Sequence, residues 1–152
     1  KAAAFKEALD PSFKEYSQQV IKNTAAMADV FAKNDKARLV SGGTDNHLLL
    51  IDVSGFALNG KQAEKLLDSV NITVNKNSIP FETLSPFKTS GIRVGTAAIT
   101  SRGFDEADAR KVAKLIVAVL EAPEDSQQLA KIALEVKQLT DIHPIYAPGA
   151  QR

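Results

Sequence analysis

The sequence predicts an α+β fold: a small, mostly antiparallel sheet with helices packed on one side. Two patterns predict it. Apolar residues at three- and four-residue steps indicate long helices towards both ends of the chain, and short apolar runs between glycine and proline clusters indicate strands in the middle. The alternation of strands and helices is too short for a doubly wound parallel sheet. We therefore expect residues 1–152 to form one domain around a single core.

The first third of the sequence is expected to form a long leading helical region. An Ala-rich helix reaches Leu9, Pro11 breaks or kinks the pattern, and an amphipathic helix of about 20 residues follows. We interpret the Phe, Tyr and Met stripe of this second helix as core packing. Two strands are expected next, at 38–40 and 47–53, separated by a turn that contains two glycines.

The rest of the sequence is expected to alternate between short strands and helices, with a loop in the middle. A helix over 61–70 is expected to start at Asn59-Gly60, and a strand at 72–74 follows it. After the loop, strands are expected at 92–95 and 96–99. The next helix is expected to be capped by Asp105, with Asp108 in the capping-box position, and to end before Pro123, and a last helix starts at Glu124 or Asp125. The two last helices are C-terminal, and the tail over 143–152 is expected to be loose.

Composition excludes several functional classes. The net charge of +1 argues against nucleic acid or an anionic membrane as a partner. The absence of cysteine excludes disulfides and thiolate metal sites, and His47 and His143 lie far apart in the sequence, so no metal site is predicted. The sequence contains no apolar run of about 18 residues and no signal-type segment, which makes a cytoplasmic location the default expectation.

The turn before the second strand offers two candidate sites, and we favour a structural role for both. Gly42-Gly43 followed by Thr44 could cradle a phosphate, but a strand follows where a phosphate loop needs a helix N-terminus. His47 beside Asp45 could form a proton relay. With no nucleophile motif nearby, a satisfied structural histidine is the preferred interpretation.

The central loop presents the strongest candidate for a binding residue. Pro80 and Pro86 restrict the backbone of the loop, and Gly91 lets the chain turn into a short strand. Alternation along that strand points Arg93 away from its apolar neighbours. A guanidinium can bind a carboxylate or a phosphate through two parallel hydrogen bonds. The alternative is an arginine paired with an acidic residue at the surface.

Three segments carry a resemblance to a known family. SPFKTSGIRVGTAAITSRGF, preceded by NKNSIPFE and further upstream by SGGTDNHLLLIDV, closely resembles the C-terminal part of serine hydroxymethyltransferase. The resemblance runs from Ala4 to about Tyr146 in the family's order and spacing. It implies the small C-terminal domain of a pyridoxal-phosphate enzyme of the aspartate-aminotransferase fold type, one that forms a homo-oligomer as the full enzyme.

The resemblance also implies roles for individual residues. Serine hydroxymethyltransferases interconvert serine and glycine and pass the hydroxymethyl carbon to tetrahydrofolate, with pyridoxal phosphate as the electron sink. By matching position, Arg93 would bind the substrate carboxylate, and Asn77 would lie at the folate. The segment at the folate would also include Ser85, Pro86 and Phe87.

The departures from the family pattern limit what this chain is expected to do alone. The Thr-rich segment with the Schiff-base lysine, the aspartate that pairs with the cofactor ring and the histidine that stacks on it are not found in this sequence, and Ala97 stands where the family usually has proline. Because the cofactor-carrying large domain is missing, we expect no catalytic residue in this chain and no activity from it alone. Its start at Lys1, inside a helical pattern, suggests a piece of a longer protein. A free-standing, non-catalytic binding or regulatory domain of the same descent, and an unrelated anion-binding domain that uses Arg93, are the alternatives.

Overall fold

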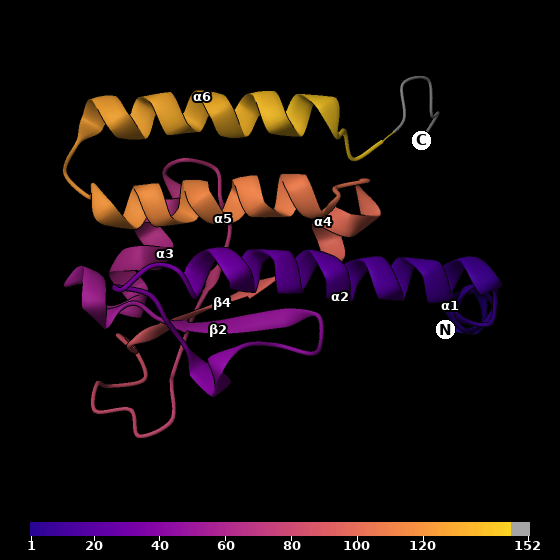
Figure 1. The fold of residues 1–152 in the computed structure, drawn as a ribbon, viewed down its shortest axis with the longest axis horizontal. Coiled ribbons are helices and arrows are strands. Elements are labelled where there is room, and N and C mark those ends of the chain that lie inside the picture. The colour runs from indigo at the N-terminus through magenta and orange to yellow at the C-terminus, as the bar shows by residue number, and fades with distance from the viewer. Residues whose placement is uncertain (147–152) are drawn as a thin grey trace.

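The computed structural model describes residues 1–146. Within them the chain forms six α-helices and a four-stranded antiparallel sheet, which confirms the predicted α+β class (Figure 1). The helices are α1 (Ala2–Ala8), α2 (Pro11–Phe31), α3 (Gly60–Asp68), α4 (Ala97–Ser101), α5 (Glu106–Glu121) and α6 (Ser126–Ile142). The strands are β1 (Arg38–Leu39), β2 (Leu48–Asp52), β3 (Asn75–Asn77) and β4 (Gly91–Gly95). Two 3-10 turns, Val40–Gly42 and Ser54–Phe56, flank β2.

The sheet has one covered face and one open face. Its strand order is β1-β2-β4-β3, and every neighbouring pair is antiparallel. Alternation along β2 and β4 sends four side chains into the core, namely Leu49, Ile51, Ile92 and Val94. The residues between them point to the opposite, open face.

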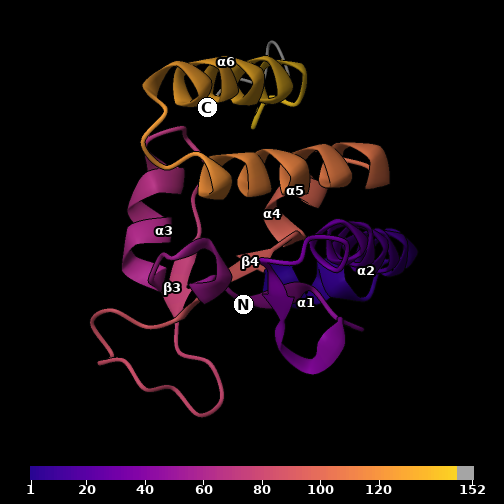
Figure 2. The same ribbon diagram turned by 60° about the vertical axis from the view of Figure 1, so that its left-hand side comes forward.

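The helices cover only the core-facing side of the sheet. Figure 2 shows α2, α3 and α5 along that side, with α6 stacked on α5 further from the sheet, while the loop between β3 and β4 projects away from the helices. The core contains Met27 and Phe31 of α2, Leu67 of α3, and Ile116 and Leu120 of α5, all almost fully buried. This one-sided covering, predicted from the sequence, leaves the open face available for a binding site.

The long helix α2 begins and packs as its residues predict, except at its first turns. Asp10 caps it by accepting a hydrogen bond from Ser12 N at 2.9 Å, and Pro11 occupies the first helical position, where its missing N–H costs nothing. The core stripe is confirmed from Val20 to Phe31. Phe13 is 43% exposed, so the stripe leaves the core towards the start of the helix.

Two of the predicted strands are wrong. The chain over 72–74 has no strand pairing, and β3 starts only at Asn75. The expected strand at 96–99 is the short helix α4. Thr96 explains that turn, because its buried hydroxyl donates to Val20 O at 2.9 Å and lies 2.6 Å from the hydroxyl of Thr24, which ties the chain to α2 after β4 ends.

The helix starts predicted from capping patterns are confirmed, and the first residue of the expected tail contacts the start of α5. Asn59 and Asp105 each form a capping box, and Asp125 caps α6. The imidazole of His143 lies 3.0 Å from an Asp108 carboxylate oxygen and packs on the ring of Phe104, 4.3 Å between centroids. His143 is therefore tied to the start of α5. The rest of the expected tail reaches into 147–152, outside the described residues.

Candidate functional site

Arg93 lies at the centre of the open face. In the middle of β4 it pairs with Leu50 of β2 on one side and with Asn75 of β3 on the other. Residues paired across antiparallel strands point to the same face, so these three side chains are neighbours. Arg93 is exposed, while Ile92 and Val94 beside it are buried, as alternation predicts.

A shallow pocket of about 350 Å³ opens beside Arg93. Its walls come from three segments that are distant in sequence: the start of β2, the approach to β3 and the strand β4. The lining residues are His47, Leu48, Thr73, Val74, Asn75, Arg93 and Gly95. The pocket therefore combines a guanidinium, an imidazole and a carboxamide, which suits a small ligand that carries a carboxylate.

The guanidinium of Arg93 is available to a ligand. Within residues 1–146 it takes part in no ion pair and no hydrogen bond to another side chain or to the backbone. Arg38 on the same face is different, since its Nε and Nη2 both donate to Asp52 Oδ2, at 3.2 and 2.8 Å. The surface ion pair considered for Arg93 is thus formed by Arg38 instead.

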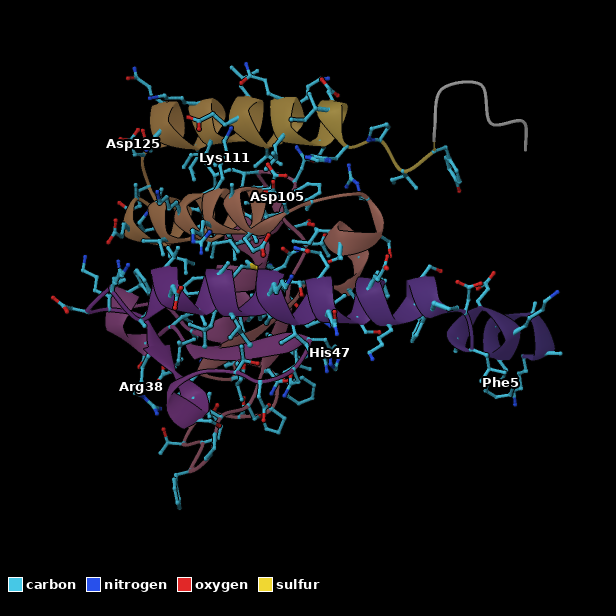
Figure 3. The ribbon with its side chains drawn as sticks, turned by 45° about the vertical axis from the view of Figure 1, so that its right-hand side comes forward. Phe5, Arg38, His47, Asp105, Lys111 and Asp125 are labelled. Carbon is cyan, nitrogen blue, oxygen red and sulfur yellow. The ribbon has the colours of Figure 1, made fainter. Side chains whose placement is uncertain are left out.

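His47 fits neither interpretation suggested by the sequence. Its side chain is exposed, so it is not a satisfied structural histidine of the interior. Within residues 1–146, no hydrogen bond or ion pair joins His47 to Asp45, whose Oδ1 accepts from Asn46 Nδ2 at 3.2 Å, and His47 lies in the wall of the Arg93 pocket. Figure 3 shows His47 and Arg38 at opposite ends of β2.

Asn77 lies on the same face as Arg93 but outside the pocket wall. It is the last residue of β3 and pairs with Gly91. Its Nδ2 donates to the Ser78 carbonyl at 2.7 Å, which orients the carboxamide. Asn75, two residues earlier and directly opposite Arg93, is a pocket residue that sequence reasoning missed. The alternation in Asn75-Lys76-Asn77 indicates that the two asparagines share a face of the strand. Only the register of β3 against β4 shows that Asn75 lies opposite Arg93.

Ser85, Pro86 and Phe87 lie in the projecting loop, and none of them lines the Arg93 pocket. The Ser85 carbonyl accepts hydrogen bonds from Lys88 N at 2.9 Å and Thr89 N at 3.0 Å, which forms a turn around Pro86. Phe87 is 80% exposed and Phe81, also in the loop, 99%. The structure therefore groups Arg93 with His47 and Asn75, and holds the proposed folate segment apart from them.

Glycines allow the close packing at the base of this loop. A Cβ on Gly91 would lie 2.7 Å from Ile79 Cγ2 and 3.0 Å from two backbone oxygens, those of Asn77 and Ile51. A Cβ on Gly60 would overlap Thr89 Oγ1 and the Gly91 carbonyl. The glycine that precedes Ile92-Arg93 is thus required by backbone packing in β4.

Two carboxylates on this side of the molecule have lowered pKa values. Burial opposes the shift at Asp52, but hydrogen bonds from Ser54 and the guanidinium of Arg38 outweigh it and lower the pKa of Asp52. At Glu82, in the projecting loop, the hydrogen bond from the Ser90 hydroxyl, followed by those from backbone N–H groups, lowers the pKa to about 2. Both side chains are anionic at neutral pH, and Asp52 places its negative charge beside Arg38.

The residues of the open face do not form a site for pyridoxal phosphate. No lysine lines the pocket beside Arg93, and that pocket is built from strands and an extended segment, without the helix N-terminus that commonly holds a phosphate. Among residues 1–146 there is also no group of three or more metal-ligating side chains. Over the same residues, no helix is long and apolar enough to cross a membrane.

Fold and site together define an α+β fold in which an arginine without a partner among residues 1–146 lies beside a pocket on an uncovered sheet face. The particular family follows from comparison with known proteins. The model of the serine hydroxymethyltransferase family matches residues 1–116, from α1 into α5, and this chain belongs to that family. It is a family of transferases in one-carbon metabolism that generally use pyridoxal phosphate and tetrahydrofolate.

Proposed function

We propose that this chain provides the substrate-carboxylate clamp and part of the folate site of a serine hydroxymethyltransferase. In that reaction serine and glycine are interconverted and the hydroxymethyl carbon passes to tetrahydrofolate. The observation that carries the proposal is the guanidinium of Arg93, which lies on the open face of a member of this family and has no ion-pair partner within the part of the chain that the structure describes. The cofactor-carrying part of the same enzyme, and a second copy of the enzyme, would be its partners.

Arg93 would bind the carboxylate of serine or glycine through two parallel hydrogen bonds. No internal ion pair within residues 1–146 has to break before the ligand binds, and a position in the middle of a strand fixes the backbone from which the guanidinium extends. Holding the carboxylate fixes the orientation of the α-carbon, which decides which of its bonds can react. His47 and Asn75 would complete the wall around the amino acid.

Asn77 and the loop that carries Ser85, Pro86 and Phe87 would contact the folate. A carboxamide offers both a donor and an acceptor, which suits the edge of a pteridine ring. The exposed ring of Phe87 offers an apolar surface to the same ligand. The projection of the loop beyond the sheet (Figure 2) is consistent with a folate that lies further from the core than the amino acid does.

Pyridoxal phosphate, which acts as the electron sink when bound, would be held by residues outside this chain. The lack of a lysine in the pocket wall supports this part of the proposal. Residues 1–152 alone should therefore be inactive, and should show no glycine-responsive absorbance band when mixed with pyridoxal phosphate. A discrete band of that kind would contradict the proposal.

The test is steady-state kinetics of the full-length protein with Arg93→Ala, Asn77→Ala and a matched control, Arg38→Ala. Removing the bidentate clamp costs about 2–4 kcal/mol, so Arg93→Ala should weaken serine and glycine binding roughly 30- to 700-fold while pyridoxal phosphate stays bound. Asn77→Ala should raise KM for tetrahydrofolate more than KM for serine. Arg38→Ala removes a guanidinium that is already bound to Asp52 through its Nε and Nη2, and should leave both KM values unchanged.

Each variant can refute one assignment. Near-normal serine affinity in Arg93→Ala would show that this arginine is not the clamp. Equal effects of Asn77→Ala on folate and serine would assign Asn77 a structural role. If the wild-type full-length protein did not transfer the hydroxymethyl group, the proposal would be refuted, and a non-catalytic domain of the same descent would describe the chain better.

A further inference from the structure

The carboxylate of Glu82 organises the loop between β3 and β4. Its Oε2 accepts hydrogen bonds from Ser90 N at 2.7 Å and from Ile79 N at 3.4 Å. Its Oε1 accepts from the Ser90 hydroxyl at 2.7 Å and from Leu84 N at 3.0 Å. A carboxylate has about four lone-pair positions, so these contacts occupy its capacity.

These contacts connect the two ends of the loop. Ile79 lies two residues after the end of β3, and Ser90 directly precedes β4. Everything between them, including the proposed folate segment, is enclosed by the Glu82 contacts. Ser90 is also three residues before Arg93, but its carbonyl accepts a hydrogen bond from Val53 N at 3.0 Å, so the start of β4 is also held by a contact that does not involve Glu82.

Apolar packing contributes little to the shape of this loop. Phe81, Leu84 and Phe87 are exposed, and of the large apolar side chains of the loop only Ile79, near its start, is half-buried. Phe81 also has a left-handed backbone, with φ of 61°, which is unfavourable for an aromatic residue and needs support from its surroundings. The loop is held by polar contacts instead: those of Glu82, the Ser85 turn, and two hydrogen bonds of 3.0 Å from Gly60 N and Lys61 N to its carbonyls.

We propose that Glu82 is a positioning residue for folate: it holds the loop of residues 78–90 in the shape that Ser85, Pro86 and Phe87 present to the ligand, without contacting the ligand itself. The inference rests on the proposed function. Because the carboxylate is already saturated by internal donors, it has no acceptor position left for a pteridine. Its effect on folate binding therefore passes through the backbone of the loop.

The experiment compares Glu82→Gln and Glu82→Asp in the full-length protein, with Glu124→Gln as the matched control. Glutamine has almost the same shape, but its NH2 group faces hydrogen-bond donors and cannot accept from them. KM for tetrahydrofolate should rise roughly tenfold or more in Glu82→Gln, because hydrogen bonds to a charged acceptor are lost. KM for serine, and kcat at saturating folate, should stay within about twofold of wild type. Glu82→Asp keeps the charge and should recover part of the loss.

The control and a second measurement separate positioning from general destabilisation. Glu124 is exposed, so the same substitution there should change neither KM. Amide hydrogen exchange should show lost protection at Leu84 and Ser90 in Glu82→Gln, with the strand amides of β2 unchanged.

Three results would count against the inference. An active wild-type enzyme with unchanged KM for folate in Glu82→Gln would overturn it and leave the proposed function standing. A parallel rise of KM for serine would also overturn it, because the effect would then reach the whole site. A wild-type protein without hydroxymethyl transfer would refute the proposed function first, and the folate role of Glu82 with it.

Discussion

Replacing Gly60 with alanine tests whether the base of the projecting loop depends on close backbone packing. Gly60 begins α3, and its N–H donates to the Thr89 carbonyl at 3.0 Å, while Lys61 N donates to the Lys88 carbonyl at 3.0 Å. An added Cβ would overlap Thr89 Oγ1 and the carbonyl of Gly91. The Thr89 side chain can rotate, but the Gly91 carbonyl belongs to β4 and cannot move without disturbing the sheet.

The magnitude follows from three contributions. Overpacking typically costs about 1–3 kcal/mol. The two backbone hydrogen bonds between α3 and the loop contribute about 1 kcal/mol each, and separation of the two segments would weaken both. Alanine restricts the unfolded chain more than glycine does, which offsets about 0.4–1 kcal/mol. Gly60→Ala should therefore lower the free energy of unfolding by about 1–4 kcal/mol.

Urea unfolding followed by circular dichroism measures this difference, with Gly43→Ala as the control. Gly43 has an extended backbone, φ of 165°, and a Cβ there would meet nothing within 4 Å. That variant should equal the wild type or exceed it by up to about 1 kcal/mol. If Gly60→Ala unfolded at the same urea concentration as Gly43→Ala, with the same slope, close packing at the loop base would not be what requires glycine there.

Two further predictions concern stability. Asn23 is fully buried on α2, and its Nδ2 donates a hydrogen bond to the Phe104 carbonyl at 2.9 Å. Asn23→Ala leaves that carbonyl without this donor and should lower the free energy of unfolding by about 1–3 kcal/mol, measured by thermal or urea unfolding. An unchanged free energy of unfolding would show that water replaces the amide. Asp52 has a pKa below its unfolded value of about 3.9, so the stability it confers with Arg38 is complete above that value and is lost as pH falls through the folded pKa. The difference between wild type and Asp52→Asn, about 1 kcal/mol, should therefore be constant near pH 7 and shrink below about pH 4; a difference that grew in acid would contradict the sign of the shift.

Local patterns were sufficient wherever neighbours in the sequence decide the conformation. Asn59 with Gln62, and Asp105 with Asp108, form capping boxes from residues three apart, so both helix starts could be predicted. The orientation of Arg93 also followed from alternation along a single strand. The strand expected at 96–99 failed for the opposite reason. The chain turns into α4 at Thr96 because Thr96 is hydrogen-bonded to α2, more than 70 residues earlier in the sequence. The sequence around Thr96 does not indicate these long-range hydrogen bonds.

By itself, the sequence determined the fold class and the helix starts, because these depend on residue type and short-range spacing, and its resemblance to serine hydroxymethyltransferase indicated the family, which the family match confirms. The role of Arg93 as a carboxylate-binding residue stays a prediction. Only the tertiary structure decided the composition of the site. His47 and Asn75 reach Arg93 through the pairing of β2 and β3 with β4, and Arg38 is excluded because Asp52 lies opposite it. Antiparallel register joins residues that are tens of positions apart, so which side chains share a face depends on how the strands align.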